Sequence, residues 1–154
     1  IKADRRILSE LSEEFGQKIK KIEQNIYNLA GSEFNIASPK QLGEILFENL
    51  GLSGGKKTKS GTWATGIDIL EDLSAIGHTI ADKIIEWRQL NKLKTTYTDS
   101  LPNFIDPSSG RVHTKFSQAL TSTGRLSSSN PNCLYSFKIL SQYTLIKALH
   151  SGLN

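Results

Sequence analysis

Residues 4–30 read DRRILSELSEEFGQKIKKIEQNIYNLA, and their periodicity decides the fold. Apolar side chains recur every three or four residues along this stretch, which places them on one stripe of an amphipathic helix. Asp4 can cap the first turn, and Gly31 follows the last one. Because about seven turns is long for a globular helix, the stretch predicts one arm of an antiparallel helical pair. The stripe consists of Leu8, Leu11, Phe15, Ile19, Ile22, Ile26 and Leu29.

A second helix is predicted to begin at the tetrapeptide SPKQ, residues 38–41. Ser38 is a suitable N-cap, Pro39 suits the first helical position, and Gln41 completes a capping box. Gly51 is expected to end this helix. Its predicted buried face consists of Leu42, Ile45, Leu46 and Leu50.

Residues 51–66, GLSGGKKTKSGTWATG, predict a flexible basic loop. A short helix is expected near 67–75. Another is expected to start at Thr79 and to run towards Leu101, where Pro102 limits it. The apolar positions of this last helix are Ile80, Ile84, Ile85, Trp87, Leu90 and Leu93.

A short β element is predicted near the end of the helical part. The tetrapeptide PSSG at 107–110 indicates a turn. The alternation over 111–118 is typical of a strand in which Val112, Thr114 and Phe116 share one face, with 123–127 as a hairpin partner or an extended segment. The predicted fold class is therefore α+β, mainly α, with a short β hairpin or extended segment near 111–128.

Composition excludes several classes of protein. The chain has 154 residues, and 19 Lys and Arg against 15 Asp and Glu give a net charge of +4. A single cysteine, Cys133, excludes an internal disulfide and a cysteine-based zinc cluster. No apolar run approaches the ~18 residues of a membrane helix, and no His-x-x-x-His pair suggests a metal. Because the chain contains no Met, we expect a piece of something longer or a processed chain.

Two groups of basic residues are candidates for binding an anion. The sequence GGKKT at 54–58 fails as a phosphate-binding loop, because Leu50 stands where that motif needs glycine and Lys57 where it needs Ser or Thr. Lys56, Lys57 and Lys59 fit either contact with a phosphate backbone or a solvated loop.

The second group lies on the helix that starts at Thr79. Arg88 and Lys92 share a helix face at i and i+4, with Lys94 off that face, and they fit either an anionic partner or a solvated surface.

Residues 110–132 are small, polar and rich in hydroxyl groups, with Arg125 between Gly124 and Leu126. An extended backbone places such an arginine to donate hydrogen bonds into a nucleic-acid groove.

This last segment carries a resemblance to a known family. TSTGRLSSSNPN at 121–132 resembles the first polymerase-domain motif of the family A DNA polymerases, of the bacterial DNA polymerase I type. Further stretches resemble the thumb region of that family in the same order. They are LSEEFG (11–16), FNIASPKQLGEILF (34–47), KKTKSG (56–61), WRQLNKLKTTY (87–97) and GRVHT (110–114). The resemblance covers residues 1–132.

The resemblance implies an organisation and a function. It implies a helical thumb-like arm over 1–106, the start of a palm-like β segment over 107–132, and a non-matching, possibly frameshifted tail over 133–154. The implied function is a fragment of a DNA-directed DNA polymerase of replication and repair, and the implied partner is the primer–template duplex. The implied location is the bacterial cytoplasm, without a membrane or a small-molecule cofactor.

The resemblance also implies roles for individual residues. In the family, the basic loop grips the duplex, the helix matching 87–97 approaches the DNA backbone, an arginine reads the minor groove at the primer terminus, and a polar residue lies near the template. These roles imply a DNA-binding set of Lys56, Lys57, Lys59, Arg88, Lys92, Lys94, Thr96, Arg125 and Asn132.

The resemblance does not bring the catalytic machinery with it. Nucleotidyl transfer in the intact family uses two Mg²⁺ ions held by carboxylates of later palm motifs. No acidic residue follows Asp106 here. We therefore expect no catalytic or metal-binding residue, no cofactor and no polymerase activity in this chain alone. The alternatives are a non-catalytic DNA-binding remnant, a pseudogene product, or a helical protein-interaction module.

Overall fold

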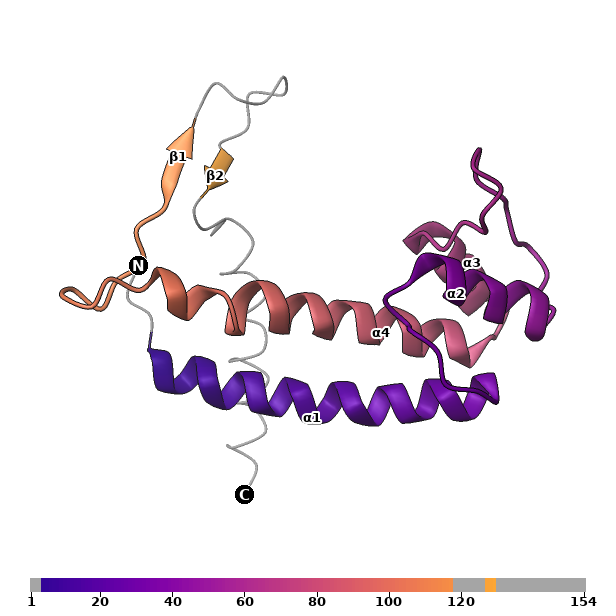
Figure 1. Ribbon diagram of the computed structural model, residues 1–154, viewed down its shortest axis with the longest axis horizontal. Helices are drawn as coiled ribbons and strands as arrows, with labels where there is room; N and C mark the ends of the chain where they lie inside the picture. Colours follow the sequence, from indigo (N-terminus) through magenta and orange to yellow (C-terminus); the bar gives the residue numbers. More distant parts are fainter. Residues whose placement is uncertain (1–3, 118–126, 130–154) are drawn as a thin grey trace. The chain divides into compact units, whose positions relative to one another are not determined.

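The computed structural model describes residues 4–117 and 127–129, and most of these residues are helical (Figure 1). The chain divides into two compact units, one drawn from residues 1–9 with 96–154 and the other from residues 10–95. The predicted fold class, α+β and mainly α, is confirmed. None of the helices in the described ranges is both long and apolar enough to span a lipid bilayer.

Helix α1, Arg5–Ala30, follows the predicted periodicity closely. The Asp4 carboxylate accepts a hydrogen bond from the Arg6 backbone N–H at 2.9 Å, which caps the first turn as expected. Every predicted stripe residue is buried except Leu29, which is 45% exposed. Leu29 lies in the last turn, about 60° around the helix from Ile26. The prediction for Leu29 was therefore wrong, because a stripe residue at a helix end has fewer neighbours to cover it.

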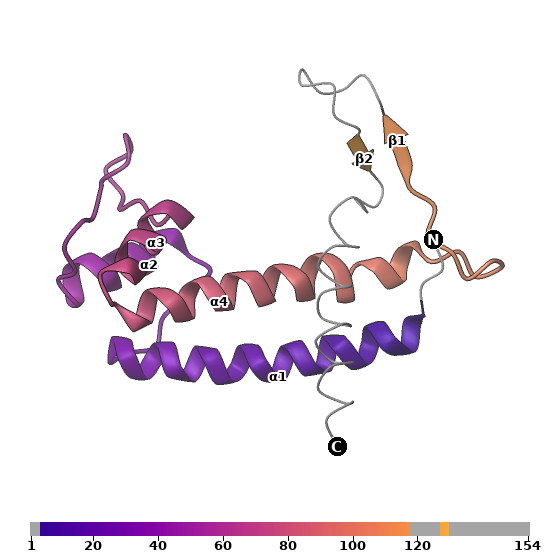
Figure 2. The same ribbon diagram turned by 180° about the vertical axis from the view of Figure 1, so that it is seen from behind.

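In the second unit, α1 pairs with helix α4, Thr79–Leu93. Trp87 Nε1 donates to Glu23 Oε1 at 3.0 Å, and Lys94 Nζ donates to Ser12 Oγ at 3.1 Å. The order of these contacts makes the two helices antiparallel, and both views show them side by side (Figures 1 and 2). Helix α3, Ile67–Ala75, packs on α4, and Ser74 Oγ donates to the Asp82 carboxylate between them.

The second predicted helix consists of two pieces, α2, Pro39–Gly43, and a π-helical turn η1, Glu44–Asn49. Ser38 Oγ accepts from the Gln41 N–H at 3.5 Å, so the predicted N-cap is confirmed. The reciprocal half of the capping box is absent, because Gln41 Oε1 accepts from the Asn35 N–H at 2.8 Å instead.

The end of this segment follows the prediction in part. Gly51 ends it in the left-handed region, with φ of 61°. Leu50 is only partly buried, whereas Phe47, which was not predicted, is 8% exposed.

The first unit is built around a small apolar core of Leu8, Leu101, Ile105 and Val112. After α4 the chain forms a π-helical turn η2, Lys94–Thr98, and a 3₁₀ helix η3, Leu101–Phe104. The predicted helix towards Leu101 therefore changes its hydrogen-bonding pattern before it ends.

Strand β1, Lys115–Ser117, pairs antiparallel with β2, Ser127–Ser129. The strand is shorter than predicted, because Val112 forms an isolated bridge with Ile105 before the strand begins at Lys115. Of the residues expected on one face, Val112 is 2% exposed and Phe116 is 58% exposed, so burial is uneven along it. Residues 118–126 and the tail over 133–154 lie outside the described residues.

Asp106 directly precedes the predicted turn at 107–110, and its pKa is lowered by hydrogen bonds from residues of that turn. Asp106 accepts hydrogen bonds from Ser109 Oγ at 2.6 Å and from the Ser108 backbone N–H at 3.1 Å. The Ser109 hydroxyl first, and then the two donors of Ser108, lower the Asp106 pKa to about 2, because these groups stabilise the carboxylate. Gly110 completes the turn with φ of 63°.

Candidate nucleic-acid interface

The basic segment between η1 and α3 is a hairpin with its own hydrogen bonds, where the sequence predicted a flexible loop. The Thr58 N–H donates to the Thr62 carbonyl at 2.7 Å, and the Ala64 N–H donates to the Lys56 carbonyl at 2.7 Å. Lys57 and Trp63 form the bridge between the two arms. We call residues 56–64 the basic hairpin.

The basic hairpin presents positive charge and hydroxyl groups together. Lys56, Lys57 and Lys59 are all exposed. Thr58 Oγ1 lies 2.8 Å from Ser60 Oγ and 2.8 Å from Thr62 Oγ1, so the hydroxyls bond one another. Ammonium groups and hydroxyls are the side-chain groups with which proteins commonly contact phosphate.

Trp63 anchors the basic hairpin to η1. Its ring lies against Phe47, with centroids 4.9 Å apart and planes tilted by 38°. Trp63 Nε1 donates to Glu48 Oε1 at 2.8 Å. Lys57 Nζ lies 4.8 Å from the Trp63 ring centroid, a cation–π distance that also orients this lysine.

A glycine allows this close approach. A Cβ atom at Gly55 would lie 2.6 Å from Phe47 Cδ1 and 2.8 Å from Trp63 Cζ3. Only a residue without a side chain therefore fits between these rings. Trp63, Phe47 and Glu48 were not predicted as anchors. The available signal was a single tryptophan in a polar, glycine-rich loop.

Arg88 forms a second attachment, from α4 to the segment that follows the hairpin. Its Nη1 donates to the Thr65 carbonyl at 2.6 Å, and its Nη2 donates to Thr65 Oγ1 at 3.3 Å. Thr65 is buried, and burial also lowers the pKa of Arg88. The guanidinium thus positions the hairpin segment, and its predicted contact with a DNA backbone stays a prediction.

The remaining predicted site residues lie on other elements or outside the described residues. Lys92 is exposed on α4, while Lys94 is partly buried and donates to α1. Thr96 is exposed in η2 and belongs to the first unit. Arg125 and Asn132 lie outside the described residues.

The described residues do not fit the pair of Mg²⁺ ions that the family resemblance implies for an intact polymerase. Within 4–117 and 127–129, no group of three or more His, Cys, Asp or Glu side chains is arranged to hold a metal ion. The hairpin donors are ammonium and hydroxyl groups, which suit an anion rather than a divalent cation.

Comparison with known proteins gives one consistent result. The family model "DNA polymerase family A" matches residues 5–135. DNA polymerase I of Rhizobium leguminosarum is 58% identical over 132 residues, and that of Bacillus subtilis is 51% identical over 132 residues. Each alignment covers 86% of this chain but only 13% and 15% of these relatives, so the chain spans about a seventh of their length.

A solved structure agrees with the sequence matches. It is the POL domain of Pol1 from M. smegmatis in complex with DNA primer-template and dNTP. Its TM-score is 0.75 at 36% identity, and the match covers 86% of this chain and 23% of that one. The family model matches far more than half of the chain, and the fold agrees with that of a polymerase domain. The chain therefore belongs to DNA polymerase family A.

Proposed function

We propose that this chain binds the primer–template duplex of DNA and that the basic hairpin is its main contact. The observation that carries the proposal is a hairpin fixed by Trp63 that carries three exposed lysines and, at its tip, a hydroxyl cluster. A pre-ordered hairpin loses less conformational entropy on binding than a flexible loop. The support from relatives is that the M. smegmatis domain was solved with primer-template DNA.

The proposed activity is DNA binding without nucleotide transfer by this chain alone. The proposal assigns phosphate contacts to Lys56, Lys57 and Lys59, and a supporting backbone contact to Arg88, Lys92, Lys94 and Thr96. Arg125 at the minor groove and Asn132 near the template complete the proposed set. Replication and repair are the processes in which the whole polymerase, with its Mg²⁺-dependent chemistry, would use these contacts.

Fluorescence anisotropy of a labelled primer–template duplex tests the proposal at several salt concentrations. Each phosphate contact contributes about 0.9 to the slope of log affinity against log salt. Replacing Lys56, Lys57 and Lys59 by alanine is therefore expected to lower the slope by up to about 2.7. The control variant replaces Lys20, Lys21 and Lys40, which are also exposed, and matches the loss of charge.

The control separates a specific interface from general attraction. If both triple variants lose the same slope, the hairpin has no special role and the proposal fails. If neither the wild type nor the control variant binds the duplex at low salt, the chain does not bind DNA by itself. A primer-extension assay with Mg²⁺ and dNTPs is expected to show no product, and extension by the purified chain would contradict the second half of the proposal.

A further inference from the structure

Gly43 is the last residue of α2, and its backbone conformation does not call for a glycine. Its φ of −64° and ψ of −42° are ordinary right-handed helical values, which alanine adopts equally well. A glycine within a helical segment lowers its stability relative to alanine, because glycine loses more conformational freedom on folding. Since α2 continues directly into η1, this cost falls inside one continuous helical segment. The reason for a glycine at position 43 therefore lies in the space around it.

Trp63 of the basic hairpin occupies the space that a side chain at Gly43 would fill. A Cβ atom at position 43 would lie 2.5 Å from Trp63 Cβ, 3.3 Å from its Cγ and 3.5 Å from its Cα. Non-bonded carbon atoms have their optimum at about 3.5–4.0 Å, so the first of these contacts is a clash. Because the Cβ of Trp63 is fixed to the backbone, no rotamer of Trp63 relieves the clash. Any side chain at position 43 therefore displaces the base of the hairpin.

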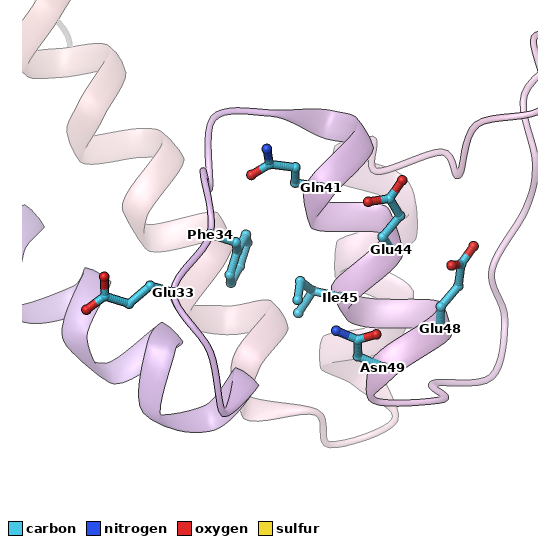
Figure 3. A pocket seen from close by; sticks show the side chains of 7 residues that line it. All are labelled: Glu33, Phe34, Gln41, Glu44, Ile45, Glu48 and Asn49. Atoms are coloured by element: carbon cyan, nitrogen blue, oxygen red, sulfur yellow. The ribbon is translucent and has the colours of Figure 1, made fainter.

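Gly43 lies on the side of the α2–η1 segment that holds the indole ring. Phe47 follows at i+4, about one turn along the segment, and its ring centroid lies 4.9 Å from that of Trp63. Glu48 accepts the hydrogen bond from Trp63 Nε1 at 2.8 Å. Figure 3 shows Ile45 pointing from η1 towards the linker that precedes α2, whereas Glu48 projects from another side of η1. The segment thus packs on the linker with one side and receives Trp63 on a different one.

We propose that Gly43 is a positioning residue for the basic hairpin, because the space left by its missing side chain is occupied by Trp63. The size of the residue at position 43 then sets how closely the hairpin base docks on α2. A larger residue loosens the hairpin while every lysine of the hairpin remains in the sequence. The consequence for DNA affinity rests on the proposed function, whereas the consequence for the hairpin itself does not.

The first test is spectroscopic and needs no DNA. The ¹H–¹⁵N spectrum of Gly43→Ala is compared with those of the wild type and of Gly16→Ala, a control in α1 whose new Cβ would have only an ordinary contact at 3.5 Å. We expect the indole N–H signal of Trp63, assigned with a Trp63→Phe variant, to shift in Gly43→Ala because its hydrogen bond to Glu48 is disturbed. The indole signal of Trp87, which bonds a residue of α1, is expected to stay in place in both variants.

Hydrogen exchange measures the docking of the hairpin directly. The N–H groups of Thr58 and Ala64, which close the hairpin, are expected to lose roughly tenfold or more in protection in Gly43→Ala, because the overpacked base opens more often. The N–H of Leu42 bonds the Ser38 carbonyl at 3.0 Å in the first turn of α2. Its protection is expected to persist, because alanine is a better helix former than glycine.

A double-mutant cycle with Trp63→Ala separates this role from an effect on α2 alone. In the presence of Trp63, Gly43→Ala is expected to lower the urea midpoint of the chain. In the Trp63→Ala background the hairpin base is free to move away. The same substitution is then expected to leave the midpoint unchanged or to raise it, as alanine usually does within a helix. In DNA titrations, Gly43→Ala is expected to bind more weakly with an unchanged salt slope, because no charge is lost.

Two results would overturn the proposal. The first is a Gly43→Ala variant in which the Trp63 indole signal and the protection of Thr58 and Ala64 equal those of the wild type. The second is an equal loss of stability in both backgrounds of the cycle, which would place the effect within α2. A loosened hairpin that binds DNA as tightly as the wild type would support the role of Gly43 and refute the hairpin as the main DNA contact.

Discussion

Replacing Trp63 by alanine tests whether the basic hairpin depends on one anchor. The substitution removes the contact with the Phe47 ring, worth about 0.5–1.5 kcal/mol, and the hydrogen bond to Glu48, worth roughly 1 kcal/mol at this partly exposed site. The cation–π contact with Lys57 adds about 0.5 kcal/mol. The hairpin is therefore expected to lose about 2 kcal/mol of docking free energy, with a much smaller effect on the α1–α4 pair.

Two measurements check this expectation. In hydrogen exchange, the N–H groups of Thr58 and Ala64, which close the hairpin, are expected to lose roughly thirtyfold in protection, since 1.4 kcal/mol is a factor of ten. In DNA titrations the affinity is expected to fall by up to the same factor, while the salt slope stays close to that of the wild type because every lysine remains. The triple-lysine variant is expected to show the reverse pattern, a reduced slope with only about a twofold loss of protection from the missing Lys57 cation–π contact.

The control for this experiment is Trp63→Phe, which keeps the ring contact and loses the hydrogen bond. Its loss of protection is expected to be intermediate. The reasoning is refuted if Trp63→Ala leaves the protection of Thr58 and Ala64 unchanged. It is equally refuted if the salt slope falls as far as in the triple-lysine variant, because the anchor would then act through charge rather than position.

Three further predictions follow from the local geometry. Gly55→Ala forces a Cβ atom to within 2.6 Å of an aromatic ring and is expected to lower stability by about 1–3 kcal/mol in urea denaturation. Gly16 lies inside α1, and its Cβ would lie 3.5 Å from Lys94 Cε, an ordinary van der Waals contact, so Gly16→Ala is expected to raise stability by about 0.5–1 kcal/mol. Equal effects of the two would contradict the packing argument. Because the folded pKa of Asp106 is lowered to about 2, its contribution to stability is present above the ordinary carboxyl pKa of about 4 and is lost as pH falls towards 2. Thermal unfolding between pH 2 and 5 is therefore expected to show a weaker pH dependence in Asp106→Asn, and an unchanged dependence would exclude this carboxylate as the cause. Arg88→Lys breaks the two-pronged contact with Thr65 and is expected to cost about 1–2 kcal/mol, and a double-mutant cycle with Thr65→Val that shows no coupling would rule that contact out.

Local patterns predicted the helices of this chain well, because each pattern depends on neighbours in sequence. The spacing from Leu8 to Ile26 was enough for α1, and Ser38 with Pro39 was enough for the start of α2. The predictions failed where a residue outside the local pattern determines a hydrogen bond or the burial of a side chain. Gln41 bonds Asn35 rather than Ser38 because the linker folds back over the helix start. Val112 is buried because it packs with Ile105 and Leu8, and these contacts cannot be inferred from the alternation of a strand.

The sequence indicated the charges of the candidate interface but not the contacts that hold the hairpin in place. Composition left Lys56, Lys57 and Lys59 open between a phosphate contact and a solvated loop, and the family resemblance favoured the contact. The hairpin that carries these lysines is held by contacts of Trp63 with Phe47 and Glu48, which precede it by about ten residues. The helical pattern around Phe47 and Glu48 does not indicate these contacts. The contact of Arg88 with Thr65 was not predictable either, since a half-buried guanidinium cannot be told in sequence from a surface cation, and its contact with DNA stays a prediction.

The separation between the hairpin base and its tip has a consequence for how this surface can change. The base is held by Trp63, whereas the hydroxyls of Thr58, Ser60 and Thr62 bond one another at the tip. Residues 58–62 can therefore be substituted while the contacts that fix the base are retained. Substitutions in these five residues, natural or engineered, can change how the tip contacts a partner without changing how the hairpin is attached.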